Sequence, residues 1–301
     1  MPSTLAIDGP ATAAIQKELR SRLIKTSRGV VEVAAWGEGP AVLSLHGAMG
    51  GYDQGILLAR TVTYPRFHYV AVSRPGYLGT PLRAGKTPQE QADLCAEVVD
   101  QLGVENAAVI AISGGGPAAL QFALRHANRC RGLVMISACS DRLDVPIPFR
   151  FQIMKLIARI PGATNAMRKK MEKDPEKAAL RAIPDDALRV RVLQDPETGP
   201  LLLALQTSVI DRMARRLPGT ENDIRQTRAE MAYPLEQISV PTLVVHGTSD
   251  SAVPFAQGRA LANRVPGAEI LAIEGGEHVS IFTHRAEVRA TMDRFLCRCV
   301  G

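Results

Sequence analysis

Aromatic side chains are scarce in this chain, since Phe, Trp and Tyr together make up 4% of its 301 residues. Proteins that bind nucleic acid combine a basic groove with aromatic side chains on which bases stack. The formal net charge is only +6, and the basic residues around Lys169 are not interleaved with aromatic side chains. We therefore expect no nucleic-acid partner and interpret these charges as a solvated helix face.

Long apolar runs are also missing. No stretch reaches the roughly 20 residues that a membrane-spanning helix requires, and the amino-terminal segment has no apolar core of signal-peptide length. We therefore expect a cytoplasmic protein without a membrane span. Nothing in the sequence indicates the number of subunits.

Cysteines are few and their spacing fits no metal site or disulfide framework. The chain has five, an odd number, at Cys95, Cys130, Cys139, Cys297 and Cys299. None forms the paired spacing of a zinc site, so we expect reduced structural thiols. No metal and no organic cofactor is expected.

What the chain does contain is an alternation of strand-like and helix-like segments. Short apolar runs predict strands at Val30–Ala35, Ala41–Leu45, His68–Ser73, Ala107–Ile112, Gly132–Ser137, Thr242–Val245 and Glu269–Ile273. Helices are predicted at Pro10–Leu23, Pro88–Leu102, Pro117–Arg125 and Arg285–Leu296. Such alternation is typical of an α/β protein with a doubly wound, mostly parallel sheet.

The alternation is interrupted between about residues 140 and 237. That stretch has no clear strand, is rich in helix formers and is punctuated by prolines. We expect it to form a helical lid, inserted into a core that consists of residues 1–139 and 238–301. An insertion at this point would lie over the carboxyl ends of the strands.

The most informative segment is Ala111–Gly116, where an apolar strand ends at Ser113 among glycines and a helix-like segment follows. A serine on a sharp strand-to-helix turn has its hydroxyl lifted clear of the sheet, and the backbone N–H of Gly114 beside it. This arrangement predicts a nucleophile with an adjacent donor for an oxyanion. By itself the same turn would also fit a glycine-rich strand-to-helix turn that binds phosphate or has no ligand.

A second donor is expected from the segment Ala41–Gly51, in which a strand leads into His46-Gly47 and a loop of small residues. The N–H of Ala48, or alternatively that of Met49, could complete an oxyanion hole. His46 itself is expected to be structural.

Two further strand ends carry the side chains that a nucleophilic serine requires. Asp250 follows the strand at Thr242–Val245, and His278 follows the Gly-Gly break after Glu269–Ile273. Taken singly, Asp250 could form an ordinary Asx turn and His278 could be a solvated loop residue. The alternatives for the acid are Asp141 and Asp144, after the strand that ends near Ala138. His284 is the alternative base.

Together these segments resemble the α/β-hydrolase superfamily, in particular its capped, esterase-like serine hydrolases. The resemblance extends from about Gly29 to Phe295 and includes the loop Val72–Pro81, and the order Ser113, Asp250, His278 is that of the family's triad. Ala111 stands where the family usually has the first glycine of Gly-x-Ser-x-Gly, and Glu277 stands where it more often has a small residue. Glu277 could raise the pKa of His278 or face solvent.

The resemblance implies a serine hydrolase that cleaves a small carboxylic ester through an acyl-enzyme. The expected partner is a small, apolar ester, in a pocket lined by Met49, Phe149, Phe151, Met154 and Val253. Those apolar residues could equally be packing between lid and core. Hydrolysis of a C–C bond, lactone or amide, perhydrolysis, acyl transfer to an alcohol, and ligand binding with slow turnover remain alternatives.

Overall fold

The structure, a computed structural model, describes residues 20–144, 146–147, 149–229 and 232–300. Its centre is an eight-stranded sheet with the order β1-β2-β4-β3-β5-β6-β7-β8. The strands are β1 (Arg22–Thr26), β2 (Gly29–Trp36), β3 (Ala41–Leu45), β4 (His68–Val72), β5 (Ala107–Ile112), β6 (Cys130–Ile136), β7 (Thr242–Gly247) and β8 (Glu269–Ile273). All neighbouring strands from β4 to β8 are parallel, whereas β2 is antiparallel to both β1 and β4.

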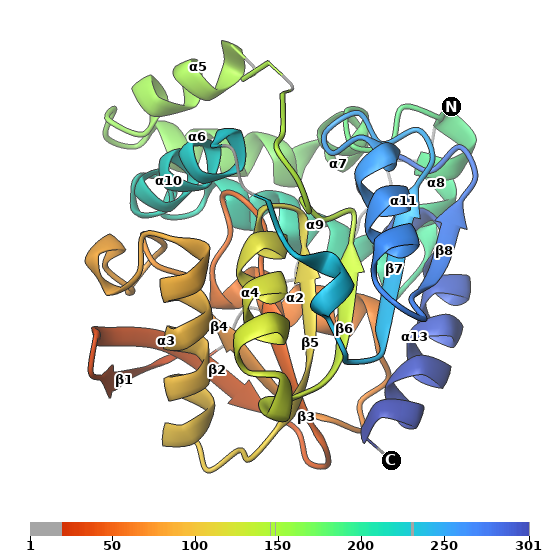
Figure 1. Cartoon of the computed structure of the whole chain (residues 1–301). Coiled ribbons are helices and arrows are strands. Elements are labelled where there is room, and N and C mark those ends of the chain that lie inside the picture. Colours follow the sequence, from red (N-terminus) through yellow and green to blue (C-terminus); the bar gives the residue numbers. More distant parts are fainter. Residues whose placement is uncertain (1–19, 145, 148, 230–231, 301) are drawn as a thin grey trace.

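Helices cover both faces of the sheet (Figure 1). One face is covered by α3 (Pro88–Gln101), α4 (Gly116–Arg125) and α11 (Phe255–Arg264). The other is covered by α2 (Tyr52–Val62), α12 (Ser280–Thr283) and α13 (Arg285–Val300). Successive strand residues point to opposite faces, so Val109 and Ala111 of β5 pack with the first group of helices, and Ala108 and Ile110 with the second.

Between β6 and β7 the described residues form six α-helices. They are α5 (Phe149–Ile157), α6 (Ala163–Lys173), α7 (Pro175–Ala179), α8 (Asp186–Gln194), α9 (Thr198–Ile210) and α10 (Leu217–Arg228). The described residues of 140–237 contain no strand. Helices α8 and α9 contribute to the same apolar cluster as α2 and α13. Figure 1 shows α5, α6 and α10 gathered at one end of the sheet, with α5 farthest from the strands.

All seven predicted strands are present, and three coincide with β3, β5 and β8 to the residue. The predicted helix Pro10–Leu23 lies mainly outside the described residues, and its last part is wrong because Arg22 and Leu23 belong to β1. That strand lies at the edge of the sheet and pairs only with β2, so no core-facing periodicity marks it. Helices α2 and α11 were not predicted.

The fold brings the predicted site segments to one edge of the sheet. The loops after β3, β5, β7 and β8 all leave the carboxyl ends of parallel strands. In open α/β sheets this edge is where ligands bind.

Candidate active site

Ser113 occupies the turn between β5 and α4 in a backbone conformation that few side chains adopt. Its φ of 53° lies in the left-handed region, which costs energy for a residue other than glycine. The turn fits because Gly115 approaches the end of β3 closely: a Cβ there would stand 2.8 Å from the carbonyl oxygens of Leu45 and His46. The predicted strained turn at Ser113 is therefore present.

The loop after β3 lies against this turn. A Cβ on Gly47 would stand 3.0 Å from the Cβ of Ser113, and the nitrogen of Ala48 is 3.6 Å from the position of a Cβ on Gly114. In the described part of the chain, no recorded hydrogen bond uses the N–H of Ala48 or of Gly114. Two backbone donors thus remain open beside the Ser113 hydroxyl.

Met49, the alternative second donor, is already engaged. Its backbone N–H donates to the hydroxyl of Thr220 in α10 at 2.9 Å, and its φ of 57° is also left-handed. A donor with a protein acceptor at that distance is not available for an oxyanion. Of the two backbone N–H groups predicted as the second donor, only that of Ala48 has no acceptor among the described residues, and it stays the prediction.

Asp250 and His278 meet across the loops that follow β7 and β8. The ring Nδ1 of His278 lies 2.8 Å from Oδ2 and 3.1 Å from Oδ1 of Asp250. The two loops are tied together, because Ser249 donates its N–H to the carbonyl of Gly276 at 3.0 Å. When Nδ1 donates to the carboxylate, Nε2 is left as the acceptor, which is the tautomer that a general base requires.

The Asp250 carboxylate is buried but well supplied with donors. Its side chain is 0% exposed, and Oδ1 accepts the backbone N–H groups of Ala252 and Val253 at 2.9 Å each. Burial by itself would raise the pKa of Asp250, but hydrogen bonds from His246 and His278 outweigh it and hold the pKa below its ordinary range. The carboxylate therefore stays ionised at neutral pH.

The alternative acids and base lie elsewhere. Asp141 and Asp144 are exposed, and Asp144 pairs with Arg142. The Nδ1 of His284 contacts the hydroxyl of its neighbour Thr283. Glu277 accepts a hydrogen bond from the Ser251 hydroxyl at 3.1 Å and so links the two loops that carry Asp250 and His278.

The link between Ser113 and His278 is open in this structure. Among the described residues no hydrogen bond joins the two, and the His278 side chain is 26% exposed. Hydrogen bonds of this kind are often long without substrate and tighten in the complex. The structure therefore has the short contact between His278 and Asp250 but no hydrogen bond between His278 and Ser113 among the described residues.

Helix α10 contributes a buried charge beside the loop after β3, and the sequence did not predict this charge. The Asp223 carboxylate accepts two hydrogen bonds from the Arg74 guanidinium, at 2.5 and 2.9 Å, and one from the Tyr77 hydroxyl at 2.5 Å. Arg74 in turn donates its backbone N–H to Nε2 of His46 and its Nε–H to the carbonyl of that residue. Asp223 also lies close to Gly114, 3.1 Å from the position of a Cβ there.

His46 is held in one tautomer by these contacts. Because Nε2 accepts from Arg74, the proton is on Nδ1, which donates to the Gly47 carbonyl at 2.7 Å. Burial and the charge of Arg74 lower the pKa of His46 well below its usual value, so the ring is neutral. His46 thus orders the loop, as the sequence suggested.

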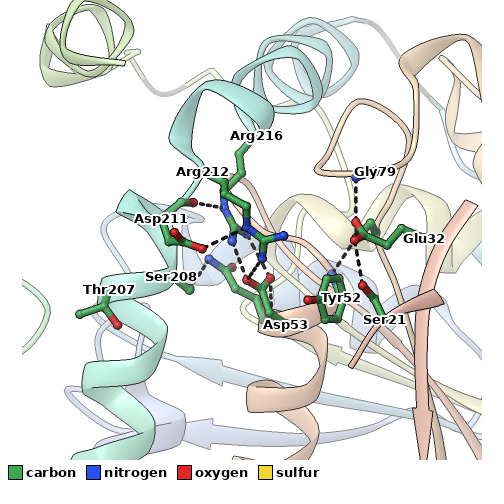
Figure 2. Close-up of polar contacts among 12 residues, drawn as sticks. Ser21, Glu32, Tyr52, Asp53, Gly79, Thr207, Ser208, Asp211, Arg212 and Arg216 are labelled. Carbon is green, nitrogen blue, oxygen red and sulfur yellow. Dashed lines mark hydrogen bonds and ion pairs between the residues drawn. The ribbon is translucent and has the colours of Figure 1, made fainter. Parts of the chain in front are cut away.

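A second buried ion pair joins Arg216 and Asp53 (Figure 2). Arg216, just before α10, donates to both oxygens of Asp53 in α2, at 2.5 and 3.1 Å. Gln54 donates to the Met49 carbonyl and to the Ser208 hydroxyl, both at 3.0 Å. No local motif marks these residues, because their partners lie far away in the sequence.

Three of the five predicted pocket residues lie together. Met49, Phe151 and Met154 belong to one apolar cluster with residues of α6, α9 and α10. Phe149 departs from the prediction, since it is 78% exposed on the opposite side of α5. Val253 is buried, and its backbone stabilises the loop after β7. Its N–H donates to the Asp250 carboxylate, and its carbonyl accepts a hydrogen bond from Nε2 of His246.

The described residues form neither a metal site nor a membrane-spanning helix. They contain no group of three or more His, Cys, Asp or Glu side chains arranged to hold a metal ion. They also contain no helix long and apolar enough to span a bilayer.

Comparison with known proteins agrees with the fold. A model of the alpha/beta hydrolase family matches residues 42–291. An alpha/beta hydrolase fold protein from Nakamurella multipartita has a solved structure that is 32% identical, with a TM-score of 0.83 over 94% of this chain and 100% of that one. Non-heme chloroperoxidase CPO-A1 of Kitasatospora aureofaciens is 25% identical over 85% of this chain and 91% of the relative.

A pimeloyl-(acyl-carrier protein) methyl ester esterase of Aeromonas hydrophila is also 25% identical, over 88% of this chain and 99% of the relative. The family match spans most of the chain, and the eight-stranded sheet, the turn at Ser113 and the loops after β7 and β8 agree with it. The chain therefore belongs to the alpha/beta hydrolase family.

Proposed function

We propose that the protein is a serine hydrolase, a carboxylesterase that cleaves small carboxylic esters through an acyl-enzyme. The observation that carries the proposal is the 2.8 Å contact between His278 Nδ1 and a buried, ionised Asp250, at the sheet edge where Ser113 stands in strained backbone. Nucleophile, base and orienting acid are the three groups that acyl transfer to water requires.

In the proposed reaction His278 Nε2 takes the proton of Ser113 as its oxygen attacks the ester carbonyl. Asp250 fixes the tautomer of the ring and stabilises the imidazolium that forms. The N–H groups of Gly114 and Ala48 bind the oxyanion. The alcohol leaves with the proton from His278, and a water that the same ring activates then hydrolyses the acyl-enzyme.

The chemistry of the surroundings supports an apolar acyl group. Met49, adjacent to the proposed oxyanion donor Ala48, belongs to the apolar cluster that includes Phe151, Met213 and Met154. Methionine is unbranched and adapts to irregular apolar partners. We propose that residues 140–237 act as the lid and that this cluster forms its substrate-facing wall.

The test is Ser113→Ala, with Ser137→Ala as the matched control. Ser137 directly follows the neighbouring strand β6, also has a left-handed φ (41°), and its buried hydroxyl has no partner among the described residues. On p-nitrophenyl esters of increasing acyl length, Ser113→Ala should lower kcat by several orders of magnitude, whereas Ser137→Ala should stay near wild type. Ester turnover near the wild-type rate in Ser113→Ala would show that the assignment of Ser113 as the nucleophile is wrong.

Other reactions on the same three residues are distinguished by substrate. The similarity to a protein named as a non-heme chloroperoxidase favours perhydrolysis as the second candidate. Peroxyacid formation from acetate and hydrogen peroxide, at a rate above ester hydrolysis, would favour it. Labelling of Ser113 by a fluorophosphonate with negligible turnover of every ester, lactone and amide would indicate a binding protein instead.

A further inference from the structure

Helix α5 presents an unpartnered apolar face. Phe149, Ile153, Leu156 and Ile160, at and just beyond the helix, are 78%, 43%, 61% and 57% exposed. Their spacing of four, three and four residues places them on one side of the helix. No described residue covers this side, and large apolar side chains gathered on one face commonly mark a binding surface.

The opposite side of α5 holds the helix on the protein. Phe151, Met154 and Ala158 pack into the apolar cluster with Met167 and Met171 of α6. The Lys155 ammonium group also pairs with Glu221 of α10 at 2.7 Å. The helix is therefore apolar on both sides and stands at the outer limit of the molecule (Figure 1).

The positive charge of the chain is concentrated in this same segment. Residues 149–173 contain seven Lys and Arg and one Glu, which gives a net charge of +6. The whole chain also has a net charge of +6, so the remaining residues are neutral in sum. An exposed apolar helix face flanked by basic residues matches the chemistry of an anionic lipid interface.

The charge also argues against the other occupants of an apolar face. A second copy of the chain seated on it would bring two segments of +6 together, and like charges at an interface oppose association. A nucleic acid would use the charge but not the apolar side chains. An anionic lipid surface satisfies both features at once.

We propose that α5 and the start of α6, residues 149–173, dock on an anionic phospholipid membrane surface. The side chains of Phe149, Ile153, Leu156 and Ile160 enter the boundary between headgroups and acyl chains, and the exposed basic residues face the lipid phosphates, namely Arg159, Lys169, Lys170 and Lys173. The helix lies in the plane of the interface and does not cross it. The proposal concerns binding alone and is independent of the catalytic assignment.

Sedimentation of the full chain with vesicles tests it. Vesicles of phosphatidylcholine that contain phosphatidylglycerol should bind the protein, and binding should weaken as salt is added because surface charges are screened. Vesicles of phosphatidylcholine alone should bind much less. Absence of binding to the anionic vesicles at low salt would overturn the proposal.

Two variant pairs separate the apolar and charged contributions. Phe149→Ser with Leu156→Ser should lower the partition coefficient at least about tenfold, since each side chain loses its burial in lipid. Leu23→Ser is the matched control, because Leu23 is 62% exposed but lies on β1. Lys169→Glu with Lys170→Glu should remove the preference for anionic vesicles.

All these side chains are exposed, so the melting temperatures should stay near wild type and a loss of binding is not a loss of fold. Equal loss in Leu23→Ser, or unchanged binding in the Phe149 and Leu156 variant, would overturn the docking of α5. A dimer in analytical ultracentrifugation that Leu156→Ser disperses would assign the face to a second copy instead and equally overturn it.

Discussion

The buried ion pair between Arg216 and Asp53 allows a stability prediction from the structure. The Arg216 side chain is 0% exposed and that of Asp53 10%, with two hydrogen bonds between them. Arg216→Met removes the charge and keeps much of the volume, so it leaves the Asp53 carboxylate buried with Arg212 at 3.5 Å as its cationic partner and with the backbone N–H of Gln54 as a donor at 2.9 Å. Removal of one partner from a buried pair typically costs about 3–5 kcal/mol. We expect a loss near 3 kcal/mol, because Arg212 compensates in part.

Matched variants separate the pair from its surroundings. Arg212 is 34% exposed, so Arg212→Met should cost about 1 kcal/mol or less. Asp53→Asn combined with Arg216→Met leaves no buried charge and should cost much less than the sum of the single changes. The assay is urea unfolding followed by circular dichroism, with the slope checked for each variant. A loss below about 1 kcal/mol in Arg216→Met, or additivity in the double variant, would refute the reasoning.

Two further predictions concern Asp250. Asp250→Asn should lower kcat by a factor of about 10³–10⁴, because an amide facing Nδ1 favours the wrong tautomer of His278. Asp144→Asn, at an exposed position, should leave kcat near wild type. A larger loss of kcat in Asp144→Asn than in Asp250→Asn, in the same ester assay, would assign the acid to Asp144 instead. Because the pKa of Asp250 is depressed in the folded protein, its contribution to stability is present above the unfolded value of about 3.9 and is lost as the pH falls below it. The unfolding free energy of wild type should therefore fall more steeply below about pH 4 than that of Asp250→Asn, and parallel curves from acid-range urea titrations would show that the carboxylate gains nothing from its hydrogen bonds.

The strands that carry the site could be predicted because they are buried on both faces. β5 reads as an unbroken apolar run, Ala107–Ile112, and ends at a serine among glycines. A continuous apolar run of that length with abrupt ends is typical of a central parallel strand. The positions of Asp250 and His278 directly after β7 and β8 follow from the same pattern, and the structure places their side chains in contact.

The elements that were missed have no such pattern. β1 is an edge strand whose Leu23 is 62% exposed, so its sequence does not distinguish it from the end of an amphipathic helix. In α2 ten of the eleven residues are buried, and a helix buried on nearly all sides lacks the polar stripe that periodicity detects. Gly55 in the middle of that helix further weakens the local signal.

The polar face of α10 shows a different limit. Arg216, Thr220 and Asp223 are spaced by four and three residues and all are buried, so the helix has a polar stripe where a core-facing helix usually has an apolar one. From the sequence alone, such a polar stripe is predicted to face solvent. Only the partners, Asp53, Met49 and Arg74, reveal the opposite orientation, and they lie 149 to 171 residues away in the chain.

The two halves of the helical segment 140–237, one with α10 and the other with α5 and α6, are therefore held in place by different interactions. Buried ion pairs hold α10, whereas mainly apolar contacts hold α5 and α6. Moving α10 would separate two buried ion pairs and the contact between Thr220 and Met49 in the loop after β3, and an uncompensated buried charge is destabilising. Moving α5 would break contacts among Met154, Phe151 and the methionines of α6, together with one half-exposed ion pair. Apolar contacts of unbranched side chains can be replaced by contacts with an apolar ligand, whereas the α10 ion pairs cannot. It follows that α10 is the half held firmly against the loop after β3, and that α5 and α6 are the half whose displacement costs least.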